Sequence, residues 1–181
     1  MKNIIVSDIF GRTEALDELA SNFSVRTEIH DPYNAKNMAF SSEQQAYDFF
    51  TQHTSLEQYT KSLLKRIQSA NSPVNLIGFS VGASAIWNIS HHSTLNNVMK
   101  ACCYYGSQIR NHLHIEPLFP ITLTFPISET HFSVTELMNK LNDTINVTVR
   151  QVSFLHGFMN SHSVNYNQEG YWSEILALSK M

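Results

Sequence analysis

The sequence predicts an α/β fold, with a mostly parallel sheet of about six strands and helices on both faces. Short runs rich in β-branched and aromatic residues alternate along the chain with segments whose apolar residues recur at the helical period. This alternation is typical of parallel strands joined by crossover helices. A chain of 181 residues is also long enough for one domain with a substantial core, and no repeat or linker divides it. We therefore expect residues 1–181 to form a single domain.

Six segments have the composition of strands. Each is short and rich in apolar and β-branched residues, and polar or turn-forming residues separate it from the next segment. The expected strands are Asn3–Ser7, Ser24–Ile29, Val74–Gly78, Val98–Tyr104, Ile121–Phe125 and Asn146–Val152.

Helical segments lie between these strands. In the first of them Leu16 and Leu19 share one face with two alanines, so this helix is expected to pack on the sheet. Residues 42–70 are too many for one ordinary helix, and Ser55 has the position of a new N-cap, so two helices are predicted there. The expected helices are Thr13–Asn22, Ser42–Ala70 in two parts, Gly82–His91, Val134–Asn142 and Tyr171–Ser179. Residues 30–41 and 106–120 are expected to be loops.

The composition argues against several classes of protein. The formal net charge is −3 and the lysines and arginines are scattered, so the sequence has no basic footprint for nucleic acid or an anionic membrane. No apolar stretch approaches the ~20 residues of a membrane span, and the N-terminus has no signal-peptide pattern. Cys102 and Cys103 lie in an expected strand, where adjacent side chains point to opposite faces, so we interpret them as small buried residues. A reducing, cytoplasmic setting fits these features.

Residues 75–85 carry the motif with the clearest chemical meaning. They have the pattern of a buried strand, a sharp turn over Gly78-Phe79-Ser80-Val81-Gly82 and a helix of small residues. In this context a Gly-x-Ser-x-Gly sequence holds the serine on a strained turn, with glycines where strand and helix approach closely. The start of the helix offers backbone N–H groups to an oxyanion. Ser80 is thus the predicted nucleophile, and a glycine-rich turn without chemistry is the alternative.

A serine nucleophile needs a base, usually a histidine, and an acid that orients the imidazole ring. In α/β-hydrolases the acid and then the histidine follow the serine along the chain. His156 lies just after the last expected strand, where a parallel sheet presents its loops, and Gly157 allows a tight turn. His156 is the predicted base, with an ordinary loop histidine as the alternative. The histidines in polar segments are interpreted as surface residues: His91, His92, His112 and His114.

The acid is expected in the loop after the strand Ile121–Phe125. The only carboxylate between this strand and Phe132 is Glu129. A glutamate can accept the imidazole N–H, although its extra methylene group changes the loop geometry that it requires. Glu129 is the predicted acid, and an exposed loop glutamate is the alternative.

Four motifs, in this order, resemble the dienelactone hydrolase family, a branch of the α/β-hydrolases. They are Asp8-Ile9-Phe10-Gly11, Gly78–Gly82, Tyr104-Tyr105-Gly106 and His156-Gly157-Phe158. The resemblance covers nearly the whole chain. It implies a shortened α/β-hydrolase fold, because the chain begins at what resembles an inner strand of that fold. The shorter sheet would expose an edge that strand pairing or dimerisation could cover, so a monomer or a homodimer is expected.

The resemblance also implies further site residues. The backbone N–H groups of Ile9 and Val81 would form the oxyanion hole, and Asp8 would lie close to the nucleophile. From their place beside the motifs, and apart from the resemblance, several aromatic residues are candidates to line an apolar acyl pocket, with a place in the core as the alternative, and Asp8 is a further pocket candidate. The aromatic candidates are Phe10, Tyr33, Tyr105, Phe132 and Phe158. Neither a cofactor nor a metal is expected.

Three departures from the family pattern affect the expected chemistry. Serine stands where the namesake enzymes carry cysteine, so thiolate chemistry is not expected. Thr130 stands where the family usually has an aspartate, which leaves Glu129 one residue earlier. Met159-Asn160-Ser161 stands where the family often has an arginine that binds a substrate carboxylate, so carboxylate recognition is not expected.

The sequence therefore predicts a serine hydrolase that cleaves a small-molecule ester or lactone through an acyl-enzyme, as a carboxylesterase or dienelactone hydrolase-like enzyme. One alternative is a catalytically degenerate relative that keeps the pocket as a small-molecule binding module. Another is a transferase or peptidase that uses the same acyl-enzyme step with a different acceptor or substrate. Nucleic acid and membrane are not expected partners.

Overall fold

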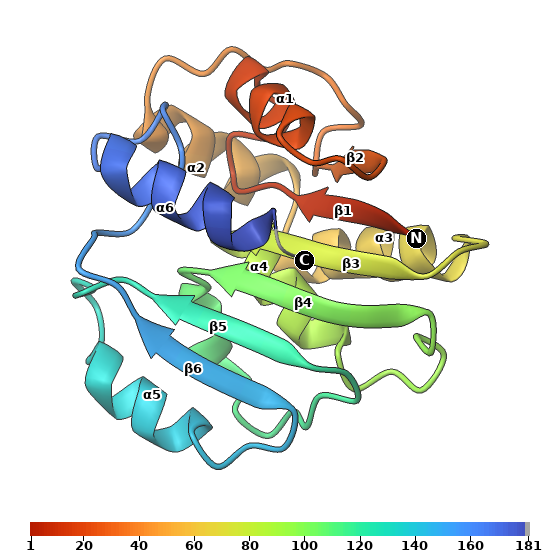
Figure 1. The fold of residues 1–181 in the computed structure, drawn as a ribbon. Helices are drawn as coiled ribbons and strands as arrows, with labels where there is room; N and C mark the ends of the chain where they lie inside the picture. The colour runs from red at the N-terminus through yellow and green to blue at the C-terminus, as the bar shows by residue number, and fades with distance from the viewer. Residues whose placement is uncertain (180–181) are drawn as a thin grey trace.

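The computed structural model describes residues 1–179 and contains a six-stranded, all-parallel sheet (Figure 1). The order of strands across the sheet is β2-β1-β3-β4-β5-β6. The strands are β1 (Lys2–Val6), β2 (Thr27–His30), β3 (Val74–Phe79), β4 (Val98–Tyr104), β5 (Ile121–Phe125) and β6 (Val147–Gln151). The predicted α/β class and the predicted number of strands are confirmed.

Helices connect the strands, and short polar side chains cap most of their starts. The helices are α1 (Glu14–Ser21), α2 (Glu43–His53), α3 (Leu56–Gln68), α4 (Val81–Ile89), the 3₁₀ helix η1 (Ser107–Asn111), α5 (Val134–Leu141) and α6 (Gln168–Leu178). The side chains of Thr13, Ser42, Ser55 and Ser133 each accept a hydrogen bond from the backbone N–H three residues later. The break predicted at Ser55 is confirmed.

Three elements differ most from the prediction. Strand β2 begins at Thr27, not at Ser24, because its partner β1 begins at Lys2 and leaves the earlier residues with no strand to pair with. Helix η1 lies in the segment predicted to be a loop. Helix α6 begins three residues before the predicted start, where Asn167 caps it by accepting the Gly170 N–H.

The helices cover both faces of the sheet and bury an apolar core on each. In Figure 1, α6 lies in front of the sheet and α3 and α4 lie behind it. The core behind contains residues of α3, α4 and α5 with Leu76 of β3, whereas the core in front contains residues of α1 and α6 with Ile77. Neighbouring residues of one strand thus face different cores. The same holds for Cys103, which lies in the core behind, and Cys102, which packs against the core in front, as predicted.

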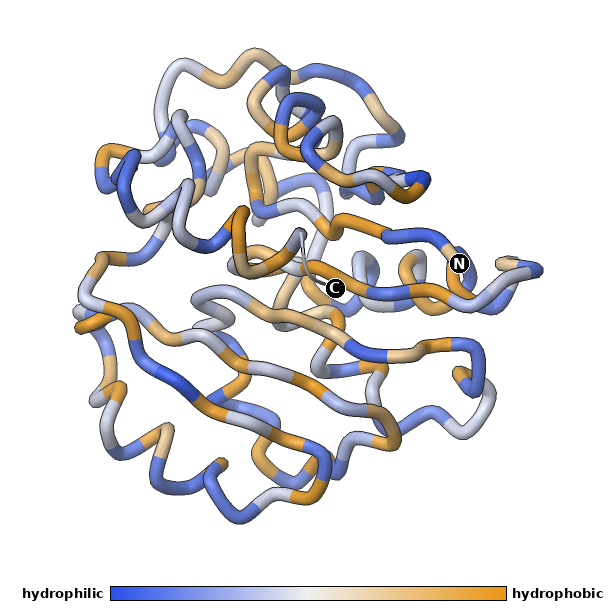
Figure 2. Tube along the Cα trace, in the orientation of Figure 1, coloured by the Kyte–Doolittle hydropathy of each residue, from blue (hydrophilic) through white to orange (hydrophobic). Residues whose placement is uncertain are grey.

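Hydropathy along the chain agrees with this two-sided arrangement. Hydrophobic segments recur along the strands, whereas the helices alternate between hydrophobic and hydrophilic residues (Figure 2). Every residue of β3 is buried, which is expected for a central strand covered on both faces. The nucleophile motif follows this strand directly.

Helix α6 is fixed to the sheet by a buried carboxylate. Glu174 is 4% exposed and accepts hydrogen bonds from the Tyr104 hydroxyl and from the Arg150 guanidinium. The Tyr104 donor is in β4 and the Arg150 donor is in β6, so one side chain joins α6 to two strands. A buried charge of this kind is stable only when hydrogen bonds and an opposite charge satisfy it.

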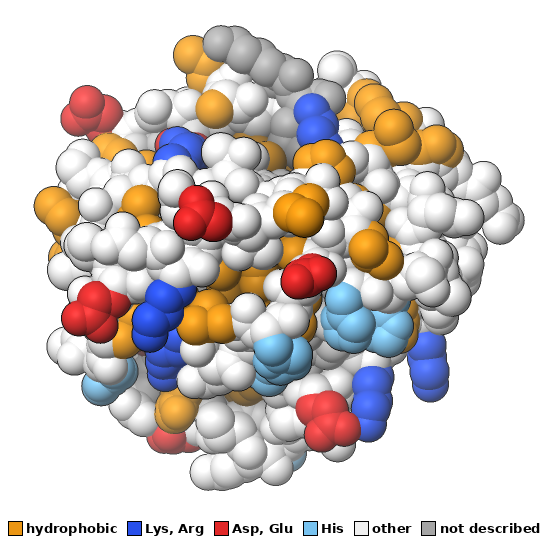
Figure 3. Space-filling view, turned by 90° about the horizontal axis from the view of Figure 1, so that it is seen from below, with side chains coloured by type: hydrophobic (Ala, Val, Ile, Leu, Met, Phe, Trp, Pro, Cys, Tyr) orange, Lys and Arg blue, Asp and Glu red, His pale blue; other side chains and the backbone are white. Residues whose placement is uncertain are grey.

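The surface of the described chain carries charges of both signs. On the face seen in Figure 3, the Lys and Arg side chains are interspersed with Asp and Glu. Strand β2 forms one edge of the sheet and pairs only with β1. Within residues 1–179, no helix has both the length and the apolar character needed to cross a membrane.

Candidate active site

Ser80 lies on a strained turn between β3 and α4. Its backbone angles are φ 51° and ψ −113°, a conformation that residues with a side chain rarely adopt. The Ser80 N–H donates to the carbonyl of Tyr104 at the end of β4, 2.9 Å away. The turn therefore raises the Ser80 side chain at the carboxyl edge of the sheet.

The two glycines of the motif are required by close packing. A Cβ atom on Gly82 would lie 2.3 Å from the carbonyl oxygen of Val6 and 2.4 Å from that of Ser7. A Cβ atom on Gly78 would lie 2.8 Å from the backbone of Ala83. These distances are shorter than any side chain tolerates, which confirms that minimal side chains are needed where the strand and helix meet.

Ser80, His156 and Glu129 form one hydrogen-bonded chain. Ser80 Oγ lies 2.9 Å from His156 Nε2, and His156 Nδ1 lies 2.7 Å from Glu129 Oε1. The side chain of His156 is 24% exposed and that of Glu129 is 12% exposed. Both distances are within hydrogen-bond range, so the structure brings together the three residues that the sequence singled out.

The loop after β6 holds the His156 ring in place. Gly157 has a φ of 85°, and a Cβ atom there would lie 2.5 Å from Ser163 Oγ. Asn165 Nδ2 donates to the His156 carbonyl at 2.9 Å. The Tyr105 ring lies 4.9 Å from the imidazole, centroid to centroid. The turn and these contacts orient Nε2 toward Ser80.

The loop that carries Glu129 is joined to the loop that carries His156. The Ile127 N–H donates to the Phe154 carbonyl at 2.8 Å, and Gln151 Nε2 donates to the carbonyls of Pro126 and Ile127. These contacts bring the backbone of residues 126–129 close to the imidazole. The Glu129 carboxylate reaches Nδ1 from this position, although Thr130 occupies the place where the family pattern has its acid.

Two backbone N–H groups are available beside Ser80. Ile9 and Val81 both line the cleft that contains Ser80. Val81 is the first residue of α4, so its N–H has no acceptor within the helix. Within residues 1–179, neither of these two N–H groups donates a hydrogen bond. Both are therefore free to donate to a negatively charged oxygen.

The cleft around Ser80 has a volume of about 550 Å³, a size typical of small-ligand sites. Its apolar lining comes from Ile9, Tyr47, Phe50, Leu56, Val81 and Phe132, and its polar lining from Glu43, Thr51, Ser107, Gln108, Arg110, Thr130, His131 and Asn165. Helix α2 supplies Glu43, Tyr47, Phe50 and Thr51, which the sequence did not associate with the site.

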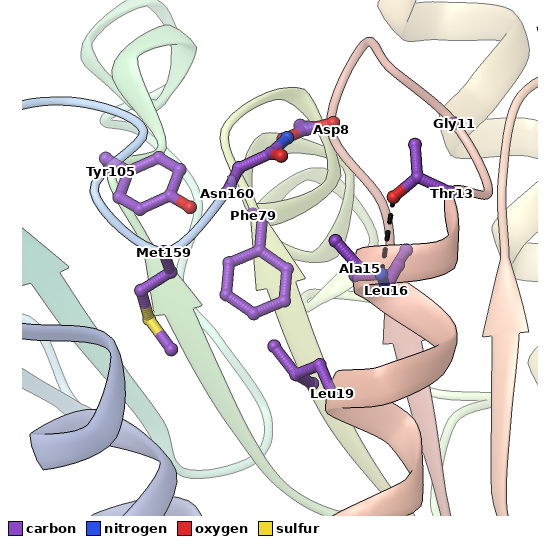
Figure 4. Close-up of a pocket in the computed structure, with 10 residues that line it drawn as sticks. All are labelled: Asp8, Gly11, Thr13, Ala15, Leu16, Leu19, Phe79, Tyr105, Met159 and Asn160. Carbon is purple, nitrogen blue, oxygen red and sulfur yellow. Dashed lines mark hydrogen bonds between the residues drawn. The ribbon is translucent and has the colours of Figure 1, made fainter. Parts of the chain in front are cut away.

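Of the candidate pocket residues, the structure brings Phe132 to this cleft, but not Asp8, Phe10, Tyr33, Tyr105 or Phe158. Phe158 and Tyr105 lie in the apolar core in front of the sheet, and Phe10 is 5% exposed and stacks on the His162 ring. Asp8 and Tyr105 line a separate cavity, which Figure 4 shows beside Phe79 and α1. Burial raises the pKa of Asp8, although hydrogen bonds from Asn160 and from the Phe10 N–H oppose the rise. Asp8 thus lines a neighbouring cavity and not the Ser80 cleft.

Arg110 is a cleft residue that the sequence did not predict. Its guanidinium lies 4.9 Å from the centre of the Phe132 ring, and Nη1 donates to the Ser107 carbonyl at 2.5 Å. Among the described residues that line the cleft, it is the only lysine or arginine. The signal available in the sequence was its place soon after Tyr104-Tyr105-Gly106, at the carboxyl end of a central strand.

Within residues 1–179, no three side chains of His, Cys, Asp or Glu are grouped as a metal ion would require.

Comparisons with known proteins agree with the fold. No protein-family model matches the chain. The uncharacterized protein YczH of Bacillus subtilis (strain 168) is 37% identical over 130 residues, which cover 70% of this chain and 62% of YczH. The matched part of the chain thus spans less than two thirds of that relative.

Solved structures match over nearly the whole chain. One is a Klebsiella pneumoniae subsp. pneumoniae MGH 78578 protein classed with the dienelactone hydrolases, with a TM-score of 0.74 and 13% identity, covering 99% of this chain and 86% of that chain. Another is a lipase-esterase related protein of Clostridium acetobutylicum ATCC 824, with a TM-score of 0.63 and 12% identity, covering 97% of this chain and 93% of that chain. The chain therefore has an α/β-hydrolase fold.

Proposed function

We propose that this protein is a serine hydrolase that cleaves a small-molecule ester or lactone. The observation that carries the proposal is the continuous hydrogen-bonded chain from Ser80 Oγ through the His156 ring to Glu129 Oε1. The chain ends at a cleft that can hold a small ligand. A serine, a histidine and a carboxylate in this order and geometry are the working parts of nucleophilic acyl transfer.

The first half of the reaction acylates the serine. His156 Nε2 takes the proton of Ser80 Oγ while Oγ attacks the carbonyl carbon of the ester. The carbonyl oxygen becomes an oxyanion, to which the N–H groups of Ile9 and Val81 donate. The tetrahedral intermediate then collapses, the protonated imidazole gives its proton to the departing alcohol oxygen, and an acyl ester on Ser80 remains.

The second half releases the acid. His156 takes a proton from a water molecule, whose oxygen attacks the acyl carbon. Collapse of the second tetrahedral intermediate breaks the bond to Oγ, and Ser80 regains its proton from the imidazole. Through both halves Glu129 accepts the Nδ1–H, which fixes the tautomer of His156 and stabilises its protonated form.

Labelling with a fluorophosphonate probe tests the nucleophile. The wild-type protein is expected to be modified at Ser80 and to turn over p-nitrophenyl butyrate, and Ser80→Ala is expected to lose both properties. Peptide mapping by mass spectrometry identifies the labelled residue. A folded wild-type protein that shows neither labelling nor turnover would refute the proposal and favour a non-catalytic binding module.

Substitution of the two partners tests the triad. His156→Ala and Glu129→Gln are each expected to lower kcat by roughly 10³-fold or more, because the base or its orientation is lost. His91→Ala and Glu116→Gln change the same residue types at exposed positions and should retain wild-type kcat. Unchanged activity in Glu129→Gln would remove Glu129 from the mechanism while leaving Ser80 and His156 in place.

A further inference from the structure

Asp8 is an ionisable residue beside the Ser80 cleft, and it contacts two different loops. It lies between β1 and α1, next to Ile9, whose N–H is available to an oxyanion. Asp8 Oδ1 accepts the Phe10 N–H at 2.9 Å within its own loop. Asp8 Oδ2 accepts Asn160 Nδ2 at 2.6 Å from the loop that carries His156. Figure 4 shows these two side chains meeting above Phe79.

The peptide group that carries the Ile9 N–H is fixed through Asp8. The carbonyl oxygen of this peptide belongs to Asp8, and it accepts hydrogen bonds from Ser7 Oγ at 3.1 Å and from the Gly11 N–H at 3.2 Å. The Ile9 carbonyl in turn accepts the Tyr33 hydroxyl at 2.7 Å. Because the Phe10 N–H donates to Asp8 Oδ1, the position of the Asp8 side chain is linked to the backbone of this turn and to the direction of the Ile9 N–H.

Hydrogen bonds within the loop that carries His156 also hold Asn160 in place. Its N–H donates to the Gly157 carbonyl, its carbonyl accepts the Ser163 N–H, and its Oδ1 accepts the His162 N–H, each at 2.9 Å. Asn160 is therefore part of the same tight turn that orients His156. The Asp8–Asn160 hydrogen bond is a direct link between the turn of the histidine and the turn of the Ile9 N–H.

We propose that the Asp8–Asn160 pair is a tether that sets the position of the Ile9 N–H relative to the Ser80–His156 pair. This inference rests on the proposed hydrolase function. Both residues act through others, since the side-chain hydrogen bonds of Asp8 go to Phe10 and Asn160 and neither residue bonds to Ser80 or His156 through its side chain. They are thus positioning residues. The tether matters most when charge develops on the substrate oxygen, so it should affect kcat more than KM.

The local geometry allows an exchange of the two residues. In the double variant Asp8→Asn/Asn160→Asp, the new amide at position 8 can accept the Phe10 N–H through its oxygen. Its nitrogen can donate to the new carboxylate at position 160, whose second oxygen can accept the His162 N–H. All three hydrogen bonds of the wild-type pair are then restored, with the donor and acceptor of the tether reversed. Asn160→Asp alone, by contrast, places two carboxylates against each other.

Steady-state kinetics on p-nitrophenyl butyrate test the tether. Asn160→Ala and Asn160→Asp are expected to lower kcat by about 10- to 100-fold, somewhat less than the loss of an oxyanion donor, with KM changed less than about threefold. The double variant is expected to regain kcat to within about threefold of wild type. Asn97→Ala is the matched control, since Asn97 Nδ2 also joins two segments, through the carbonyls of Ile67 and Ala70, but at the opposite edge of the sheet. It should lower the thermal midpoint without lowering kcat.

A second readout does not depend on turnover. In ¹⁵N-labelled protein, the amide resonance of Ile9 and the imidazole resonances of His156 should both shift in Asn160→Ala and return in the double variant. If wild type turns over no ester, this measurement still decides whether the pair couples the two loops. The tether is refuted if Asn160→Ala keeps kcat within twofold of wild type, if its shifts stay within residues 157–163, or if a folded double variant recovers neither kcat nor the Ile9 resonance.

Discussion

The backbone of Ser80 shows why this part of the site could be predicted from sequence. Its unusual φ of 51° is possible because Gly78 and Gly82 let the strand and helix approach without Cβ clashes. These packing requirements concern only the five residues from Gly78 to Gly82, so the motif alone predicts this turn. His156 was identified for a similar reason, since Gly157, with a φ of 85°, directly follows it.

Other residues of the site could not be predicted because their positions depend on tertiary packing. Arg110 and the α2 residues reach the cleft from elements whose placement no local pattern specifies. Asp8 and Tyr105 were expected in the pocket because they lie beside motifs, yet a motif fixes the backbone and not the direction of every side chain. The Asp8 side chain turns to Asn160, far along the chain.

Arg110 leads to a prediction about substrate charge. The other four arginines all pair with carboxylates, whereas none of the ion pairs within residues 1–179 involves Arg110. Arg110→Gln should lower kcat/KM for mono-p-nitrophenyl succinate by about tenfold, the value of one charge-assisted hydrogen bond, and change p-nitrophenyl butyrate little. The succinate ester ends in a carboxylate where the butyrate ester ends in a methyl group.

Arg12→Gln is the control for this comparison, since Arg12 pairs with Asp17 outside the cleft. It should leave both esters unchanged. Equal losses on both esters in Arg110→Gln would mean that Arg110 supports the cleft wall through Phe132 and does not select charge.

At the scale of elements, those with local signals were predicted most closely. Strands β4 and β5 have the predicted bounds, and the cap at Ser55 marked the break between α2 and α3. Helix η1 has no such signal, because tertiary contacts hold it, such as the Trp87 Nε1 bond to the His112 carbonyl at its end. The start of α6 was missed because Gly170 disfavours a helix, yet a Cβ there would meet the Phe154 and Phe158 rings.

Strand β2 ends in a histidine whose titration should affect stability. His30 stacks on the Tyr59 ring, and its Nε2 lies 2.9 Å from Ser62 Oγ. Burial lowers the pKa of His30 to about 4, with Arg66 acting in the same direction and Asp31 opposing it. The folded state therefore prefers the neutral ring, whereas the unfolded chain takes up a proton near the ordinary value of 6.5.

The stabilising contribution of neutral His30 is complete above about pH 6.5 and is lost as the pH falls toward 4. Urea denaturation measures the free energy of unfolding. Between pH 7 and pH 5, this free energy should fall by between about 1 and 2 kcal/mol more in wild type than in His30→Gln. His114→Gln, at an exposed position, should follow wild type. If the free energy of unfolding changes with pH by the same amount in wild type and in His30→Gln, the prediction is contradicted.

At the scale of the whole molecule, the site is assembled from loops at one edge of the sheet. Asp8 and Ile9 follow β1, Ser80 follows β3, Glu129 follows β5 and His156 follows β6. All strands are parallel, so these loops meet although they are far apart in the chain. Because of this topology, the order of Ser80, Glu129 and His156 along the chain predicts that their loops meet at one edge of the sheet.

The opposite edge should tolerate insertion. The turn between α3 and β3 contains the exposed Asn71 and no residue of the cleft. A short Gly-Ser insertion between Asn71 and Ser72 is expected to leave kcat/KM within twofold of wild type, because the insertion point is an exposed turn at the edge of the sheet away from the cleft. The same insertion between Glu129 and Thr130 should lower it at least about 100-fold, since the acid is displaced.

Ester turnover and thermal midpoints measured on both insertion variants test whether the edge with the Asn71 turn is independent of the cleft. A large loss of kcat in the first variant without a lower midpoint would show that the two edges are coupled.

The parallel sheet also has a practical consequence. Because every loop of the candidate site leaves the same edge, an attachment point in the Asn71 turn would fix the molecule to a support with its cleft facing outward. Immobilised in this way, the chain would present one uniform orientation to dissolved substrates. Its strand direction thus supplies a built-in orientation for a surface-bound catalyst or sensor.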